Sequence, residues 1–327
     1  MKNLWIIVAI GILGLSSCKK EDVAMDEELV GEINLNAEYG MKPASAEMGS
    51  DYSVQSYFDL ATNTTVASNH KLDWEIAFSC DSTLVMLNQA ISDLRVAKYN
   101  GNWTDLVDET TLEFGWDSPS GTSDDFFIGS AIDQIYIVKR GFNTLGEERG
   151  YRKIFVEAND GAYTITTALL DGTDERQFTV DTDPAYNFVY AHLENGQVNV
   201  APPKEDWDIM FTHYLYIYDP ETEPFPYQVT GCLINPHYVR AYRTAEYTFD
   251  EVDWALAQTF NMTEKWDEIG FDWKVFDFDL GFIVDETIIY LVESTEGEFY
   301  KMKFTSFYND QGDKGYPQFM VQKLLEE

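Results

Sequence analysis

Hydrophobic and polar residues alternate strictly in two similar stretches of the chain. The first stretch covers residues 73–79 and the second covers residues 206–212. Both read Asp, Trp, an acidic residue, Ile, an apolar residue, Phe and a hydroxyl residue. Alternation of this length predicts a strand that buries one face, with the Trp, Ile and Phe side chains on that face. Two copies so far apart indicate a duplicated unit.

The segments around these two stretches follow the same order in both halves of the chain. Each half has a Tyr- and Phe-rich strand before the Trp stretch, then an apolar strand that ends in Asn, then a Gly-Trp block. Each half closes with a predicted hairpin, which pairs residues 135–138 with 151–156 in the first half and 288–292 with 300–304 in the second. This order predicts an all-β fold of antiparallel sheets.

The predicted organisation is two tandem β units with at most minor helix. We expect the first unit at residues 51–173 and the second at residues 174–327, with one helical segment around residues 252–266. The content of 45% hydrophobic and 15% aromatic residues excludes a largely disordered chain and suits strands.

The two halves differ most between the Trp and the Asn that ends the apolar strand. The segment from Trp207 to Asn235 is twice as long as the segment from Trp74 to Asn88. The extra residues lie at and around positions 219–226, where three prolines predict a loop.

The N-terminus has the pattern of a secretory signal. A short charged start is followed by an apolar run at residues 4–15, which is too short to span a bilayer comfortably. The run closes with Leu, Ser, Ser and Cys18, a sequence similar to a bacterial lipobox. We therefore expect a lipoprotein signal peptide at residues 1–17, a lipid anchor on Cys18 and an acidic tether at residues 18–50. The acyl chains would hold the protein on the membrane.

The net charge narrows the range of partners. The 57 acidic and 22 basic residues give a formal charge of −35, and removing residues 1–17 takes away only Lys2, which makes it −36. Such a chain is repelled by phosphate backbones, so nucleic acid is not expected as a partner.

Two cysteines, Cys80 and Cys232, remain after Cys18 is assigned to the lipid. In an oxidising compartment they could form one disulfide that joins the two halves. The alternative is a pair of buried free thiols, since free Cys behaves as a small hydrophobe. The sequence leaves both open.

Taken in order, these blocks resemble the HmuY family of bacterial cell-surface lipoproteins, whose founding members capture haem. The resemblance rests on the Tyr/Phe strand, the Trp stretch, the apolar strand ending in Asn, the Gly-Trp block and the closing hairpin. It implies haem or another iron-source ligand, an outer-membrane location facing the exterior and an outer-membrane transporter as partner. Family members that use histidines place one shortly after the late Trp block. Residues 273–279 contain neither His nor Met, so the family ligands cannot be transferred to this chain.

Four histidines are available as alternative iron ligands, and two of them are candidates. His213 follows the second Trp stretch and His237 follows the apolar strand. Strand packing could bring these two imidazoles together, and imidazoles on opposite sides of an iron would make a haem site. The alternative is that both histidines are structural. No other metal site can be assigned from the sequence.

Enzymatic function is not expected, because no nucleophile elbow, zinc motif or phosphate loop is present in the sequence. The alternative to haem capture is a structural, adhesive or glycan-binding surface protein that kept the fold. Both Trp stretches are expected in the cores of their units. The ligand is therefore expected at the parts where the copies differ, namely residues 219–226 and the loops after Trp116 and Trp273.

Overall fold

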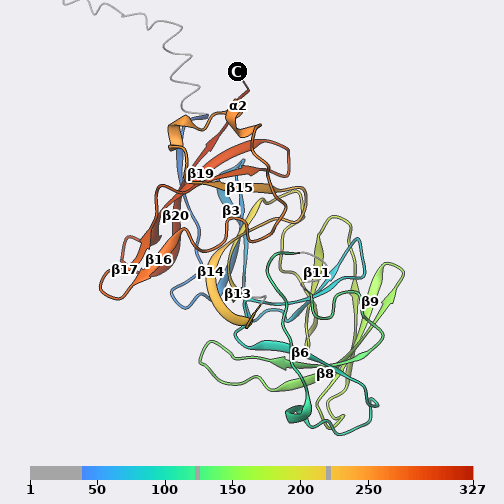
Figure 1. The fold of residues 1–327 in the computed structure, drawn as a ribbon. Coiled ribbons are helices and arrows are strands. Elements are labelled where there is room, and N and C mark those ends of the chain that lie inside the picture. Colours follow the sequence, from blue (N-terminus) through green and yellow to red (C-terminus); the bar gives the residue numbers. More distant parts are fainter. Residues whose placement is uncertain (1–38, 122–125, 219–221, 327) are drawn as a thin grey trace, which may run out of the picture. The chain divides into compact units, whose positions relative to one another are not determined.

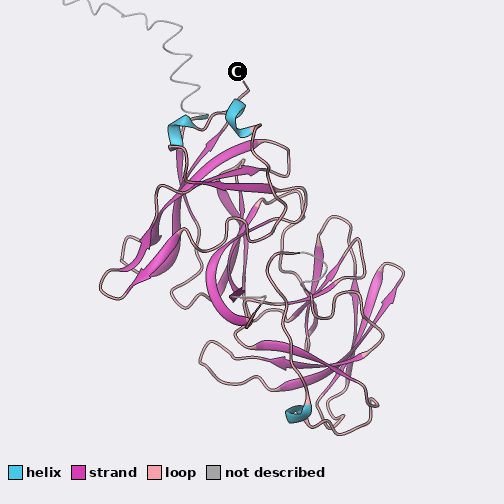
Figure 2. Cartoon of the chain, viewed as in Figure 1, coloured by secondary structure: helices cyan, strands magenta, loops and turns pink. Residues whose placement is uncertain are grey.

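The computed structural model describes residues 39–121, 126–218 and 222–326, whose regular secondary structure is almost entirely antiparallel strand (Figures 1 and 2). The all-β prediction is confirmed. The predicted signal peptide, Cys18 and most of the tether lie outside the described residues, as do residues 219–221 of the predicted loop. Within the described ranges, no helix is both long and apolar enough to cross a membrane.

Nine consecutive strands form what we term lobe 1. They are β4 (Ile76–Ser79), β5 (Val85–Leu87), β6 (Leu94–Tyr99), β7 (Ile135–Arg140), β8 (Tyr151–Asn159), β9 (Ala162–Ala168), β10 (Arg176–Asp181), β11 (Phe188–His192) and β12 (Gly196–Val198). One sheet has the strand order β12-β11-β4-β5 and the other the order β10-β9-β8-β7-β6.

Strands from both ends of the described chain form lobe 2. They are β1 (Lys42–Ser45), β2 (Val54–Asp59), β3 (Thr64–His70), β13 (Ile209–Tyr218), β14 (Phe225–Ile234), β15 (Arg240–Thr244), β16 (Lys274–Asp277), β17 (Gly281–Val284), β18 (Ile289–Glu293), β19 (Phe299–Tyr308) and β20 (Lys314–Lys323). The sheets have the orders β1-β20-β19-β18-β15, β14-β13-β2-β3 and β16-β17 (Figure 1). The two predicted closing hairpins are present as β7–β8 and β18–β19.

Each Trp strand pairs with the Tyr/Phe strand of the other half of the sequence. β4 pairs with β11, where Ala77 lies opposite Tyr190, and β13 pairs with β2, where Met210 lies opposite Tyr57. The repeat aligns Ala77 with Met210, and by the same offset it aligns Tyr57 with Tyr190. The two pairings therefore have the same register with the halves exchanged, as in a strand exchange between two related units.

The lobes consequently differ from the predicted units at residues 51–173 and 174–327. β2 and β3 belong to lobe 2 although they precede lobe 1, and β10 to β12 belong to lobe 1 although they follow residue 173. The main hydrophobic clusters follow the lobes, since one draws on residues between Ile76 and Leu193 and the other on residues 46–60 and 209–321. Alternation predicts which face of a strand is buried but not which strand lies beside it, so it could not reveal the exchange.

The helix predicted at residues 252–266 is mostly absent. Helical turns are limited to η1 (Glu109–Thr111), η3 (Phe249–Glu251) and α2 (Trp254–Ala257) within the described residues. The side chain of Asp253 caps α2 by accepting from the Leu256 N–H at 2.7 Å. Beyond α2 the backbone of Thr263 forms a β-bridge with Ala241, which requires an extended chain.

The loop predicted at residues 219–226 is partly strand. β13 and β14 continue as a long hairpin in which Ile217 lies opposite Pro226 and Tyr218 opposite Phe225. β14 is an edge strand, and an edge strand tolerates proline because its outer N–H groups need no partner.

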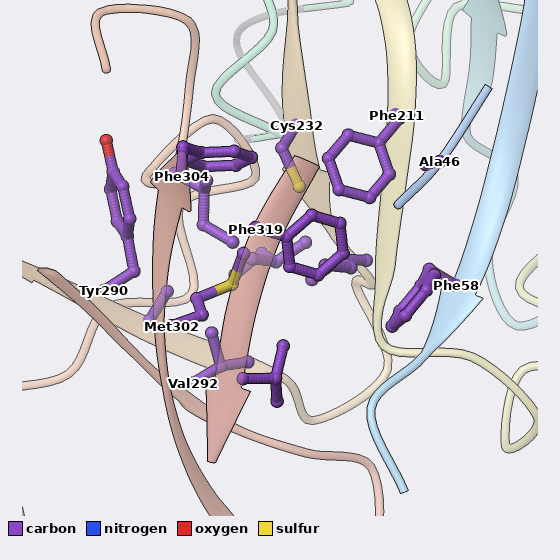
Figure 3. Close-up of a cluster of buried hydrophobic side chains, with 14 of the residues drawn as sticks. Ala46, Phe58, Phe211, Cys232, Tyr290, Val292, Met302, Phe304 and Phe319 are labelled. Atoms are coloured by element: carbon purple, nitrogen blue, oxygen red, sulfur yellow. The ribbon is translucent and has the colours of Figure 1, made fainter. Parts of the chain in front are cut away.

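Cys80 and Cys232 are free thiols, so the structure agrees with the second of the two alternatives and contains no disulfide between them. Cys232 is fully buried in the core of lobe 2, beside Phe211 and Phe304 (Figure 3). Cys80 packs against the hydrophobic cluster of lobe 1 instead. Each thiol fills a different core, as expected of cysteine acting as a small hydrophobe.

The acidic residue of each Trp stretch is buried and binds the end of the partner strand. The Glu75 carboxylate accepts from the Leu193 N–H at 2.9 Å, and the Asp208 carboxylate accepts from the Leu60 N–H at 2.9 Å. The remaining partners differ. Glu75 also accepts from two arginines, whereas Asp208 accepts from the backbone N–H and the hydroxyl of Thr295.

The Asn that ends each apolar strand is fully buried and has an equivalent role in both halves. The Asn88 side chain donates to the Trp74 carbonyl at 3.0 Å, and the Asn235 side chain donates to the Trp207 carbonyl at 2.6 Å. The two Trp stretches are therefore held by the same kinds of hydrogen bond.

Candidate ligand-binding site

The two tryptophans of the repeated stretches do not point into the cores of the lobes. Trp74 and Trp207 belong to a separate cluster that takes residues from both lobes. Ile76 and Ile209 pack into the cores of lobe 1 and lobe 2. The alternation therefore does not extend to the tryptophans, because each strand begins at the Ile and the residues before it lie outside the strand.

A pocket opens on this shared cluster, and we name it the tryptophan pocket. Aromatic side chains from both lobes line it, among them Tyr57, Trp74, Tyr190, Trp207 and Trp266. Each Trp of the repeat packs edge-on against a Tyr of the paired strand, with ring centroids 4.8 Å apart for Trp74–Tyr190 and 5.0 Å apart for Trp207–Tyr57. The cavity volume is about 70 Å³. This is the room of roughly five water molecules.

Four buried polar atoms in the pocket walls have no hydrogen-bond partner among the described residues. They are Gln89 Oε1, Trp207 Nε1, His213 Nδ1 and the Tyr214 hydroxyl. Trp207 is 5% exposed and Tyr214 is 1% exposed. A buried polar group without a partner is unfavourable by about 1–3 kcal/mol, so such groups in a pocket wall indicate where a ligand binds.

The structure places His213 in the tryptophan pocket and His237 outside it. His213 lies opposite Thr230 in the β13–β14 hairpin, whereas His237 follows the end of β14 at Ile234, and its ring packs on Tyr238 at 4.3 Å. Four strand positions between Thr230 and Ile234 amount to about 13 Å. The predicted pair of imidazoles is therefore not brought together.

His213 is uncharged at neutral pH. Burial lowers the pKa of this imidazole to about 3, and the positive charge of Lys71 acts in the same direction. A neutral imidazole retains a nitrogen lone pair and can bind a metal or accept a hydrogen bond.

Two methionines, Met86 and Met210, line the same pocket and were missed by sequence reasoning. Met210 lies within the second Trp stretch, and Met86 lies in the apolar strand β5, so both were assigned to core packing. The signal that could have identified Met210 is its position shortly after Trp207 in the repeated stretch. The side chains at Trp207 and Met210 share a face because the strand starts between them.

The donor types that hold haem iron are therefore present in one pocket, because imidazole and thioether are both known axial ligands. The space does not admit a whole porphyrin in this conformation, since pockets for drug-sized ligands measure about 300–1,000 Å³ and this cavity measures about 70 Å³. In the part of the chain that the structure describes, no group of three or more His, Cys, Asp or Glu side chains could hold a metal ion.

The family model of the HmuY protein matches residues 184–320. Over this region, which is less than half of the chain, the protein is similar to the HmuY family. The matched region contains β13 to β19 of lobe 2 and several residues of the pocket lining, including Tyr190, Trp207, Met210, His213 and Trp266. Tyr57, Trp74 and Met86 lie before it.

Two solved structures illustrate the similarity. Apo PinO from Porphyromonas gingivitis is 12% identical, with a TM-score of 0.34, and the match covers 88% of this chain and 99% of PinO. The apo HmuY analog of Tannerella forsythia is 10% identical, with a TM-score of 0.22, and the match covers 88% of this chain and 96% of the analog. No curated protein matches the chain in sequence.

The loops where we expected the ligand are not part of the tryptophan pocket, apart from Pro119. The segment after Trp273 forms the β16–β17 hairpin, which exposes Phe276, Phe278 and Leu280. The hairpin of β13 and β14 exposes Tyr218, Phe225 and Tyr227 near its tip. The pocket is instead lined by the repeated stretch that sequence reasoning had assigned to the core.

Proposed function

We propose that this HmuY-type protein is a surface-anchored lipoprotein that captures a flat, largely apolar ligand and acts without catalysis. Haem is the leading ligand, and an outer-membrane transporter is the partner that receives it. The lipobox-like N-terminus supports the lipid anchor on Cys18, and the resemblance to the HmuY family supports the exterior-facing location. An anionic membrane surface repels a chain of such high negative charge, so the acyl chains would attach the protein to the membrane.

One observation carries the proposal. His213, Met86 and Met210 line a single pocket whose walls are aromatic side chains. Imidazole and thioether groups bind haem iron, and aromatic walls stack against a porphyrin face. Haem iron has two axial positions, so two of these three residues would hold it, and a bound haem would supply iron for uptake.

Haem capture at this site requires the pocket to widen. The cluster behind the pocket takes residues from both lobes, including Trp74 from the first and Trp207 from the second. A change in packing between these side chains enlarges the cavity without breaking the sheets on either side. We therefore expect haem binding to be slower than entry into an open cleft.

Haemin titration of residues 19–327, which lack the predicted signal peptide and Cys18, tests the proposal. We expect a shifted Soret band at micromolar haemin. Replacing His213 by alanine should weaken binding by more than roughly tenfold, because even outer-shell partners of a metal ligand have effects of that size. Absorbance spectroscopy measures the Soret shift, and isothermal titration calorimetry measures the affinity for haemin.

The matched control is His237→Ala, because this histidine lies outside the pocket and should leave haemin binding unchanged. Met86→Leu and Met210→Leu then separate the two thioethers, since leucine keeps the volume and removes the sulfur. An unshifted Soret band throughout the titration would remove haem as the ligand.

The second candidate function is glycan binding by the exposed hairpin of β13 and β14. Tyr218, Phe225 and Tyr227 are 42%, 59% and 54% exposed, and the rings of Phe225 and Tyr227 are stacked at 6.3 Å. Flat exposed rings can stack on neutral sugars. Binding to immobilised neutral oligosaccharides that is lost in Tyr227→Ala would favour this function.

A further inference from the structure

The two halves of the tryptophan pocket differ in one hydrogen bond. On the first side, Trp74 Nε1 donates to Gln55 Oε1 at 3.0 Å. The repeat that aligns Trp74 with Trp207 also aligns Gln55 with Phe188, by the same offset along the sequence. Phe188 has no acceptor atom in its side chain, and among the described residues Trp207 Nε1 has no partner.

The two tryptophans differ in this respect because of the residues around them, although both occupy equivalent positions in the fold. Gln55 Oε1 also accepts from the side chain of Asn69 at 3.0 Å, so its orientation is fixed. On the second side, the repeat aligns Pro202 with Asn69, and proline cannot orient an amide at this position. The second side thus has neither the acceptor that binds the indole on the first side nor the amide that orients this acceptor.

The other unpartnered groups of the pocket can also receive a polar ligand group. His213 Nδ1, the Tyr214 hydroxyl and Gln89 Oε1 lie in the same lining as Trp207, and the Gln89 oxygen can only accept. The ammonium of Lys71 is close enough to act on His213, and its positive charge favours an anionic over a cationic ligand.

We infer that the indole N–H of Trp207 donates a hydrogen bond to an acceptor oxygen of the bound ligand, and that the pocket selects flat aromatic molecules bearing a carboxylate. This inference rests on the tryptophan pocket being the ligand site, as proposed above. Trp207 is then a specificity-determining residue, whereas Trp74, already bonded to Gln55, supplies only an aromatic wall. Indole nitrogen is a donor and never an acceptor, so the ligand must bring the acceptor.

The indole N–H resonances of ¹⁵N-labelled residues 19–327 test the inference directly. Benzoate and toluene are the probes, because they share a ring and only benzoate carries an acceptor. We expect benzoate to move the Trp207 resonance downfield and toluene to leave it without a downfield shift. The Trp74 resonance is the internal control and should show no new hydrogen bond with either probe. The signal lost in Trp207→Phe identifies the resonance.

Two variants at position 188 test the hydrogen bond of the Trp207 indole in the protein without ligand. In Phe188→Gln the new amide stands where Gln55 stands on the first side, so the Trp207 resonance should move downfield in the free protein. Benzoate affinity should then fall by roughly tenfold or more, the value of one hydrogen bond to a charged group. Phe188→Leu, which offers no acceptor, should leave the resonance in its original position.

The outcomes separate this inference from the haem proposal. A benzoate-dependent shift at Trp207 without a haemin Soret band supports the inference and removes haem as ligand. A haemin Soret band together with a Trp207 resonance that benzoate does not move overturns the inference alone. Equal shifts with toluene and benzoate also overturn it, because they show a purely apolar site.

Discussion

Replacing Glu75 by glutamine is expected to lower the free energy of unfolding by about 3–5 kcal/mol, the usual effect of removing one partner of a buried ion pair. The Glu75 side chain is completely buried, and its Oε1 accepts from Arg140 at 2.6 and 2.9 Å and from Arg149 at 2.6 Å. Glutamine keeps one oxygen but leaves Arg149 without its carboxylate and Arg140 with Glu194 as its remaining carboxylate partner. Denaturant unfolding of residues 19–327 measures the difference.

The equivalent substitution in the second half, Asp208→Asn, is the matched control and should have the opposite effect at pH 8. No cation binds Asp208 among the described residues, and burial raises the pKa of its carboxyl to about 6 from the usual 3.8. The stability that this group contributes is full below pH 3.8 and is lost as the pH rises through about 6. Asparagine removes the buried charge and should therefore stabilise the protein above pH 6, less the cost of the one backbone N–H, of Leu60 or Thr295, that its amide nitrogen cannot accept from.

The expected gain for Asp208→Asn is at most roughly 3 kcal/mol at pH 8 and should turn into a loss near pH 4, where only the missing acceptor distinguishes the two proteins. Unfolding curves of both proteins between pH 4 and pH 8 test it. Asp206→Asn, at an exposed neighbouring position, should show no such pH dependence. A loss of stability below about 1 kcal/mol in Glu75→Gln would contradict the ion-pair argument for the first half.

The second prediction concerns the ability of two fragments of the chain to fold alone. We expect residues 72–206 to fold alone and residues 51–173 to remain unfolded. The first fragment contains all strands of lobe 1 and its whole hydrophobic cluster. The second fragment lacks β11, the partner of β4, and contains β2 and β3 without β13. An isolated two-stranded hairpin is at best marginally stable in water.

Thermal unfolding followed by circular dichroism, together with a proton–nitrogen correlation spectrum, distinguishes the two fragments. Residues 72–206 should show one cooperative transition and dispersed resonances, whereas residues 51–173 should show neither. A cooperative transition in residues 51–173 would mean that the halves fold as consecutive units and that the exchange is not needed for stability.

The sequence predicted the kinds of strand and their order, because each strand has its own pattern of apolar positions. The β7–β8 and β18–β19 hairpins are local, so short-range patterns were sufficient. β4 and β13 each pair with a strand from the other half of the sequence, and no local pattern records such a pairing.

The candidate site was predicted less well than the fold. His213 was named from the sequence and lies in the pocket, whereas His237 does not. Met86 and Met210 resemble core residues in sequence, since an apolar side chain beside a pocket and one inside a core follow the same alternation. The unpartnered Trp207 N–H could be found only in three dimensions, although the exchange of Gln55 for Phe188 was visible in the repeat.

The strand exchange also determines the order in which the protein can fold as the chain emerges. β2 and β3 are synthesised first, yet β2 finds its partner β13 only after the whole of lobe 1 has been made. Lobe 1 is contiguous and can complete its sheets before β13 is available. Until then β2 presents an unpaired edge to solvent, and such edges favour association with other chains. A protein of this topology therefore needs chaperones more for its first strands than for the middle of the chain.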